Sequence, residues 1–295
     1  MKITEHIDAL EAAGHALADA AAEAGPDADV PTCPGWRIRD LLRHTTMVHR
    51  WATAFVVEGH TSYHPDGGEP DLDGDELITH YREGHALLVA ALRAAPDTLE
   101  CWTFLPAPSP LAFWARRQAH ETTVHRADAE SALPAGPGPV DAAVAADGID
   151  ELLRGFHARD RSRVHTPEPR TLRVHATDTG DTWTVHLSAT EPPRTERGFL
   201  APTASSETEA AGTSTVDEGL GVDEGPRADG GPGVDGGPGV DGGPGVDGVL
   251  AVDAELSGSA DRLYLALWNR LPADAVTVTG DTALARLWRE TSAII

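Results

Sequence analysis

The stretch Phe113-Trp-Ala-Arg-Arg-Gln-Ala-His-Glu-Thr-Thr-Val-His-Arg-Ala-Asp-Ala129 decides the fold, because as a helix it places a carboxylate and an imidazole on its apolar side. At roughly 100° per residue, Glu121 and His125 lie only about 40° apart, in the same arc as Trp114. An ionised glutamate is almost never buried without a partner. A divalent metal shared with the neutral imidazole is one candidate partner.

Two ordinary arrangements stay open for the same pair. Glu121 and His125 can share a hydrogen bond, or Glu121 can pair with Arg116 or Arg117 inside a helical core. The run from His120 to His125 also looks like the zinc-protease motif H-E-x-x-H, but it has one residue too many. Five residues turn a helix by about 140°, so these two histidines cannot bind one metal from a regular helix. We therefore expect His120 to be solvated or to lie behind the metal ligands.

Composition and charge limit the class of protein. The 295 residues allow two domains, and 40% hydrophobic residues can bury a core. The longest apolar runs are far shorter than the ~20 residues that cross a bilayer, and the chain opens on an amphipathic helix, so we expect a cytoplasmic protein with no membrane partner. The net charge of -24 argues against a nucleic-acid partner. Cys33 and Cys101 are expected to stay thiols.

Helical periodicity and capping signals predict a helical first half. Gly25-Pro26 ends the first predicted helix, and Ser109-Pro110 supplies an N-cap and a first-turn proline for the fourth. The predicted helices cover about residues 4–24, 38–57, 76–95, 110–132 and 140–161. Cores of helical bundles are regular places for metal sites built from facing helices.

The second predicted helix carries two histidines, His44 and His49. Because they are five residues apart, at most one of them can point at a given spot. The apolar residues of this helix centre nearer His49, and His44 lies at the edge of that face. The pattern alone therefore leaves the choice between them open.

After Pro167 the apolar period falls to two, which predicts strands. The expected strands are 171–177, 182–188, 249–254 and 275–279, with helices at 260–271 and 283–290. Residues 201–248 are of low complexity and include three tandem copies of Gly-Gly-Pro-Gly-Val-Asp. Without large side chains to bury, this acidic segment cannot offset the entropy of ordering, so we predict a disordered insertion.

These elements predict an α+β protein in three parts. Residues 1–165 form a helical metal-binding domain, and residues 166–200 and 249–295 form a small α/β domain. The insertion 201–248 interrupts the second domain.

Three motifs resemble the mycothiol-dependent maleylpyruvate isomerase family. They are Cys33-Pro-Gly-Trp-Arg-Ile-Arg-Asp-Leu-Leu-Arg-His44, then Glu121-x-x-x-His125, then Ser257-Gly-Ser-Ala-Asp-Arg-Leu-Tyr-Leu-Ala-Leu-Trp-Asn-Arg270 with Gly280-Asp281 near the end. The resemblance covers both domains except the insertion. It implies a DinB-like four-helix domain followed by a sterol-carrier-like α/β domain, and an actinobacterial source fits the chain's abundance of Ala, Arg, Gly and Pro.

The resemblance also implies a site. Its metal triad maps onto His44, Glu121 and His125, a sound ligand set for zinc. Zinc would lower the pKa of mycothiol, a low-molecular-weight thiol cosubstrate, for addition to an electrophilic small molecule. The resemblance places Arg270 at the substrate, where a guanidinium could hold a carboxylate. Since the nucleophile belongs to the cosubstrate, Cys33 is expected to be structural.

Other functions stay open from the sequence. The chain could be a metal-dependent hydrolase that uses metal-bound water, or a metal-binding module without catalysis. The thiol-dependent function requires an open, cationic pocket between the metal and Arg270. An ordinary role for Arg270 is to cap carbonyl groups or to pair with Asp274 or Asp281. The sequence does not predict the substrate or the oligomeric state.

Overall fold

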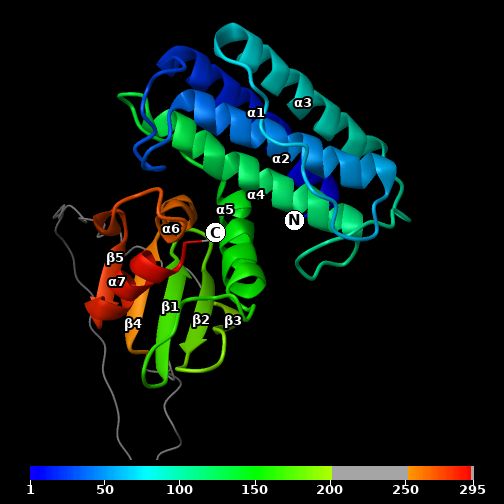
Figure 1. Ribbon diagram of the computed structural model, residues 1–295. Coiled ribbons are helices and arrows are strands. Elements are labelled where there is room, and N and C mark those ends of the chain that lie inside the picture. Colours follow the sequence, from blue (N-terminus) through cyan, green and yellow to red (C-terminus); the bar gives the residue numbers. More distant parts are fainter. Residues whose placement is uncertain (201–251, 294–295) are drawn as a thin grey trace, which may run out of the picture. The chain divides into compact units, whose positions relative to one another are not determined.

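The computed structural model describes residues 1–200 and 252–293. The predicted disordered insertion at 201–248 lies outside these residues. The chain begins with four long helices, which are α1 (Ile3–Ala24), α2 (Ile38–Glu58), α3 (Gly74–Ala94) and α4 (Pro110–Ser131). Helices α1 and α2 each pack against both α3 and α4, as Figure 1 shows. The predicted bundle of four N-terminal helices is confirmed, and each helix begins and ends within about two residues of its predicted limits.

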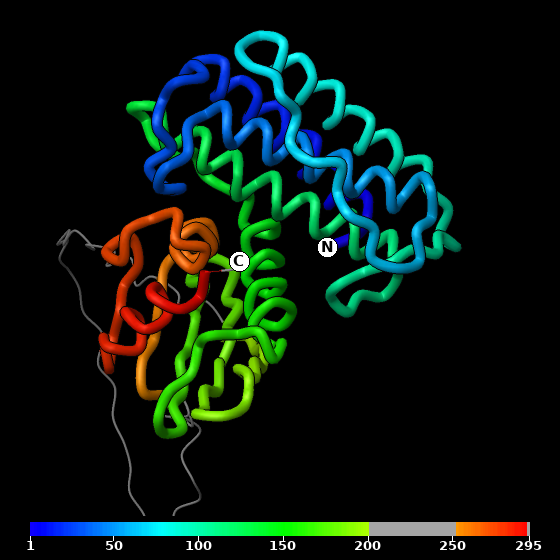
Figure 2. The backbone as a smooth tube through the Cα atoms, in the orientation of Figure 1, coloured from blue at the N-terminus to red at the C-terminus, as the bar shows by residue number. Residues whose placement is uncertain are grey.

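The fifth predicted helix is shorter and less regular than expected. It consists of α5 (Ala142–Asp150) and a π-helical turn, η1 (Glu151–Phe156). The backbone trace in Figure 2 follows both as one continuous coil after α4. Helix α5 packs against α6 (Ala260–Leu267), and η1 contacts the sheet. The sequence periodicity could not reveal the π-turn, because a segment of six residues is too short to show a period of its own.

A five-stranded mixed sheet follows, as the α+β prediction requires. Its strands are β1 (Arg170–Ala176), β2 (Asp181–Leu187), β3 (Arg194–Phe199), β4 (Ala254–Gly258) and β5 (Thr277–Gly280). The order is β3-β2-β1-β4-β5, with β1 and β4 parallel and every other pair antiparallel. Helix α6 packs on β1 and β4, and α7 (Thr282–Thr291) packs on β4 and β5.

One strand of this part is not predicted from the sequence, and two predicted elements have other limits. Strand β3 has no sequence signal, because five of its six residues are exposed and it lacks apolar alternation. Strand β4 runs over Ala254–Gly258 instead of 249–254, and residues 249–251 of the expected strand lie outside the described part of the chain. Asp253 precedes the strand and accepts a hydrogen bond from the backbone N–H of Thr171 at 2.7 Å. Helix α6 ends at Leu267, four residues before its predicted end.

Of the helices that the structure describes, none combines the length and the apolar composition needed to span a membrane.

The contact between α5 and α6 depends on a glycine. A Cβ on Gly148 would lie 2.3 Å from Cε2 of Tyr264 and 2.9 Å from Nδ1 of His120. We therefore expect Gly148→Ala to lower the free energy of unfolding by about 1–3 kcal/mol through overpacking. Urea denaturation followed by circular dichroism measures the change.

Gly84→Ala on α3 is the matched control. The nearest atom to its added Cβ is a side-chain atom of Arg50 at 3.7 Å, an ordinary contact. Because alanine is the better helix former, this variant should be neutral or gain up to about 1 kcal/mol. Equal effects of the two substitutions would show that α5 and α6 do not pack as closely as described.

Candidate metal centre

Helix α4 is buried around most of its circumference. Ser109 begins it as the N-cap, with its Oγ accepting from the N–H of Ala112 at 3.1 Å, and Pro110 takes the first helical position. The helix packs against α1 and α2, and Tyr264 of α6 donates to the backbone oxygen of His120. Polar side chains on several faces of α4 are therefore buried, not only those on the predicted inward arc.

The three predicted metal ligands lie together. The Nε2 atoms of His44 and His125 lie 3.6 and 3.2 Å from the same oxygen, Oε1 of Glu121. One ligand atom from each residue lies within 4.8 Å of the other two. Two ligands bound at 2.0–2.1 Å to a tetrahedral zinc ion lie about 3.3 Å apart. The donor set and its spacing therefore fit a divalent ion such as zinc.

The structure brings His44, and not His49, to this group. His49 is fully buried, and its Nε2 lies 2.9 Å from Oγ1 of Thr122. Burial, followed by the neighbouring His85, lowers the pKa of His49 to about 3, so its imidazole is neutral. His49 is a neutral core histidine that bonds to Thr122 through Nε2, while its Nδ1 has no hydrogen-bond partner among the described residues.

Asp128 orients His125. The Nδ1–H of His125 donates to Oδ2 of Asp128 at 2.8 Å, so Nε2 is the atom that faces Glu121 and that would supply a lone pair to a bound metal. Burial lowers the pKa of His125, but the hydrogen bonds to Asp128 and Glu121 outweigh it and raise the pKa to about 9. Burial likewise raises the pKa of Glu121, yet the hydrogen bonds from His125 and His44 hold it well below its usual range. The site therefore favours a cation between its carboxylates.

Asp128 also binds Arg270. Arg270 donates from Nε and Nη2 to the two carboxylate oxygens at 2.9 and 3.0 Å, a bidentate pair, and Thr32 donates from Oγ1 at 2.6 Å. The sequence offered Asp274 or Asp281 as an ordinary ion-pair partner of Arg270. In the described structure its carboxylate partner is Asp128 instead. Arg270 does cap a carbonyl group, because its Nη1 donates to the oxygen of Trp268 at 2.7 Å.

The end of α6 places Arg270. Asn269 takes the left-handed conformation, with φ of 61°, just after the helix. The N–H of Arg270 donates to the oxygen of Leu265 at 2.7 Å, and the N–H of Asn269 donates to that of Ala266 at 3.0 Å. This is the Schellman pattern of a helix end, for which asparagine is a suitable residue. The Leu-Trp-Asn-Arg motif is thus a helix stop that turns the arginine back toward α4.

A tight turn brings Cys33 and Trp36 to the same place. Gly35 has φ of 88°, and the N–H of Trp36 donates to the oxygen of Cys33 at 2.9 Å, as in a type II turn. The ring of Trp36 lies 5.1 Å from that of His44. Burial, and then the charge of Asp128, raise the pKa of the Cys33 thiol to about 12. Cys33 is therefore a protonated thiol at neutral pH.

These residues line one pocket of about 710 Å³, which we call the metal pocket. This volume suits a small-molecule ligand. His44, Glu121, His125 and Arg270 all contribute to its walls. Aromatic side chains provide much of the rest, namely Trp36, Trp51, Phe104, Phe156 and Trp268.

Arg117 supports the ligand Glu121 from inside this pocket. Its Nη2 lies 3.2 Å from Oε2 of Glu121, and its Nη1 donates to Glu151. The guanidinium lies over the rings of Phe156 and Trp268, at 5.0 and 5.7 Å from their centroids. The Glu-Arg pair that the sequence left open is therefore formed, and it coexists with the metal-ligand geometry.

Two family models match the chain. The "Mycothiol maleylpyruvate isomerase N-terminal domain" matches residues 7–130, and the "MDMPI C-terminal domain", named by the initials of the same enzyme, matches residues 143–287. The chain belongs to the mycothiol-dependent maleylpyruvate isomerase family. No curated protein and no solved structure matches it. Its three predicted metal ligands fall within the first matched segment and Arg270 within the second.

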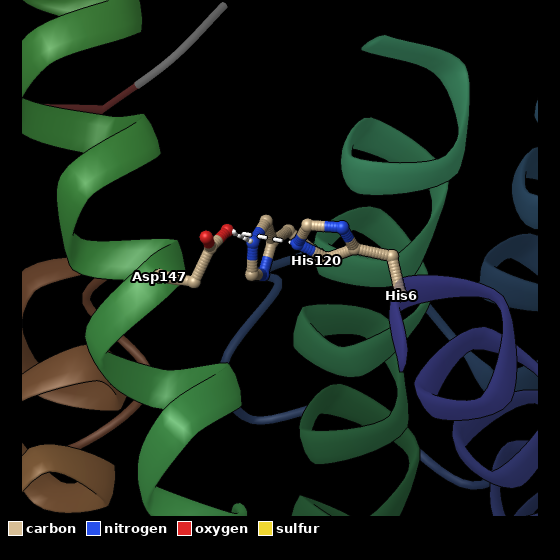
Figure 3. A group of neighbouring side chains, drawn as sticks. All are labelled: His6, His120 and Asp147. Carbon is tan, nitrogen blue, oxygen red and sulfur yellow. Dashed lines mark hydrogen bonds and ion pairs between the residues drawn. The ribbon is translucent and has the colours of Figure 1, made fainter. Parts of the chain in front are cut away.

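This member of the mycothiol-dependent maleylpyruvate isomerase family also has a second group of potential ligands. Figure 3 shows His6 of α1, His120 of α4 and Asp147 of α5 converging from three helices. The Nε2 atoms of His6 and His120 lie 3.1 and 2.8 Å from Oδ1 of Asp147. The sequence left two positions open for His120, in solvent or behind the metal ligands. The first was wrong, because His120 is fully buried. A helical wheel assumes one buried face, and α4 has more than one.

The charges around this second group favour an ion-pair anchor over a metal site. The Nε–H of Arg116 donates to the same oxygen of Asp147 at 2.6 Å, and the ammonium of Met1 lies 3.7 Å from the other oxygen. These cations already neutralise the carboxylate that a metal would need. Burial raises the pKa of Asp147, but the hydrogen bonds from His120 and His6 outweigh it and hold the pKa well below its usual range. The anchor ties α1, α4 and α5 together.

Asp147→Asn should destabilise the protein in a pH-dependent way. At pH 7 the substitution leaves Arg116 with only the more distant Asp150, at 3.4 Å, as a charged partner, and we expect a loss of about 3 kcal/mol. Because the folded pKa of Asp147 lies below the unfolded value, its stabilisation is present above about pH 4 and is lost as the pH falls. Urea unfolding at pH 7, 5 and 3 should show the gap to wild type closing.

Asp97→Asn, a change of an exposed aspartate, is the control for lost charge. A constant difference between Asp147→Asn and wild type at all three pH values would contradict the assignment of Asp147 as a charged anchor.

Proposed function

We propose that this chain is a thiol-dependent enzyme of the isomerase or S-transferase type, with a divalent ion, best matched by zinc, held by His44, Glu121 and His125. One observation carries the proposal. The two imidazoles converge on one carboxylate oxygen at 3.6 and 3.2 Å, at the wall of a pocket of about 710 Å³. Membership of the family indicates a mycothiol-dependent isomerase type of function and supports mycothiol as the thiol.

The proposed ligand set suits this chemistry. Two imidazoles and one carboxylate leave a coordination position free for an incoming group. A zinc ion bound there would lower the pKa of a coordinated thiol and supply a thiolate at neutral pH. The pKa of about 12 keeps Cys33 protonated, which supports a nucleophile that comes from the cosubstrate.

Residues around the ligands would hold this geometry. Asp128 fixes the tautomer and ring orientation of His125, the usual role of a carboxylate behind a ligating histidine. Arg117 holds the second oxygen of Glu121, so that Oε1 faces the two imidazoles. The aromatic walls would shield the reacting thiolate from bulk water, which strengthens electrostatic interactions in the pocket.

Arg270 would act in two ways. It holds Asp128 by a bidentate ion pair and thus supports His125 indirectly. It also lines the metal pocket, where we propose that it contacts a carboxylate of the electrophilic substrate. Its charge is largely balanced by Asp128, so a substrate carboxylate would share the guanidinium with that residue.

Metal and thiol dependence test the proposed function. Purified protein should contain close to one equivalent of divalent metal and should consume an electrophile such as maleylpyruvate only when mycothiol is added. Glu121→Ala should lose metal first and activity as a consequence, because a three-ligand set becomes a two-ligand set. Elemental analysis and a spectroscopic assay measure the two effects.

His15→Ala, which removes an exposed histidine of α1, is the matched control and should retain both metal and activity. Turnover that needs metal but no thiol would favour a hydrolase instead. Protein without metal, with His44→Ala indistinguishable from wild type, would overturn the metal site.

Arg270→Ala should separate metal binding from catalysis. We expect metal content to stay intact while kcat/KM falls about 30- to 1000-fold, the usual loss for a charged hydrogen-bonding partner worth 2–4 kcal/mol. Arg262→Ala, which removes an exposed arginine of α6, the helix that Arg270 follows, is the control. Unaltered kinetics with a lowered melting temperature would assign Arg270 a structural role only.

A further inference from the structure

A smaller pocket adjoins the metal pocket. It has a volume of about 270 Å³, and we call it the arginine pocket. It shares Phe104, Phe156 and Ala293 with the metal pocket. Its remaining walls are His157, Arg159, Arg161, Ser162, Arg163 and Thr291. The two pockets therefore lie side by side and share these residues as walls.

The arginine pocket carries positive charge that no carboxylate balances within residues 1–200 and 252–293. Arg159 donates from Nε to the backbone oxygen of Phe156 at 3.3 Å, and Arg163 donates from Nη2 to that of Ala293 at 3.2 Å. Neither these two arginines nor Arg161 forms an ion pair in that part of the chain. The chain has 47 acidic residues against 23 basic ones, so carboxylate partners are plentiful elsewhere. Three adjacent, unbalanced guanidinium groups indicate a place for an anion.

A buried imidazole forms part of the same pocket. His157 is 2% exposed, and its Nδ1 lies 3.1 Å from Oγ of Ser162. That hydroxyl oxygen accepts from the N–H of Val164 at 3.3 Å, so its own hydrogen is available for Nδ1. Nε2 of His157 then carries the proton and faces the backbone of Ser292, which is the acceptor within its reach. His157 therefore forms a buried, neutral part of the wall beside the three arginines.

One aromatic ring joins this pocket to the metal ligands. The guanidinium carbon of Arg159 lies 4.9 Å from the centroid of Phe156, and that of Arg117 lies 5.0 Å from the same centroid. Arg117 in turn pairs with Glu121. Only the ring of Phe156 therefore separates Arg159 from Arg117, the residue that pairs with a metal ligand.

We propose that the arginine pocket is an anion subsite that takes a carboxylate-bearing arm of the substrate, while the reacting carbon lies in the metal pocket. Arg159, Arg161 and Arg163 supply the charge that would hold this arm. This assignment rests on the proposed function for the identity of the molecule, but the binding of an anion does not depend on it. Phosphate shares the charge of a carboxylate, so the two anions must be told apart.

Calorimetry with simple anions tests the subsite directly. The probes are succinate and inorganic phosphate, titrated into the full chain and into Arg161→Gln/Arg163→Gln, which changes two exposed side chains. We expect the Kd for succinate to rise at least tenfold in the double variant and to rise with added salt. Arg262→Gln/Arg286→Gln removes the same charge from exposed positions outside the arginine pocket and should bind succinate like wild type.

A kinetic experiment links the subsite to catalysis. With an active, metal-loaded enzyme, the double variant should raise KM for an anionic electrophile about tenfold and leave kcat within about twofold, because the arm binds away from the reacting carbon. If the enzyme shows no thiol-dependent turnover, the proposed function fails, while the calorimetric loss still supports the subsite. Succinate binding that is equal in all variants, or phosphate binding that is tighter than succinate binding and alone lost in the double variant, would overturn the carboxylate subsite.

Discussion

The buried carboxylate of Asp128 is the interaction on which the rest of the site depends. It receives hydrogen bonds from His125 of α4, Thr32 of the loop before α2, and Arg270 after α6. Removing one partner from a buried ion pair typically costs several kcal/mol, so each of the three segments is held where it can reach this carboxylate. The orientation of a metal ligand, the turn that carries Cys33 and the end of α6 are thus fixed by one charge.

The two histidine clusters of α4 differ in their balance of charge. Glu121 meets one guanidinium and two imidazoles whose Nε2 atoms can turn a lone pair toward a metal, and it lines a pocket. Asp147 also meets two imidazoles, but Arg116 and the ammonium of Met1 already surround it. The same residue types therefore favour a metal centre at one place and an ion-pair anchor at the other. Residue identity alone does not separate these outcomes, because the deciding cations come from other parts of the chain.

Local features were predictable from the sequence, and tertiary ones were not. The limits of α4 and the four-residue spacing of Glu121 and His125 depend on a cap, a proline and a helical repeat, so the sequence predicted them. The helical wheel placed His49 nearer the apolar face than His44, and only the family resemblance selected His44. Strand β3 is an exposed edge without alternation, and the partner of Arg270 lies 142 residues away. Neither leaves a local pattern in the sequence.

The net charge of -24 limits the ligands less than it first suggests. Charges on an exposed surface are screened beyond about 8–10 Å at physiological ionic strength. The binding of a small anion inside a pocket therefore depends mainly on the charged side chains that line the pocket. In the metal pocket, carboxylates pair with Arg117 and Arg270. These two arginines therefore do little to repel a metal ion. In the arginine pocket, none of the three guanidinium groups forms an ion pair with a described residue, and Arg159 and Arg163 donate to backbone carbonyl groups. An acidic chain can thus exclude a polyanion such as nucleic acid and still present a local cationic surface to one small anionic substrate.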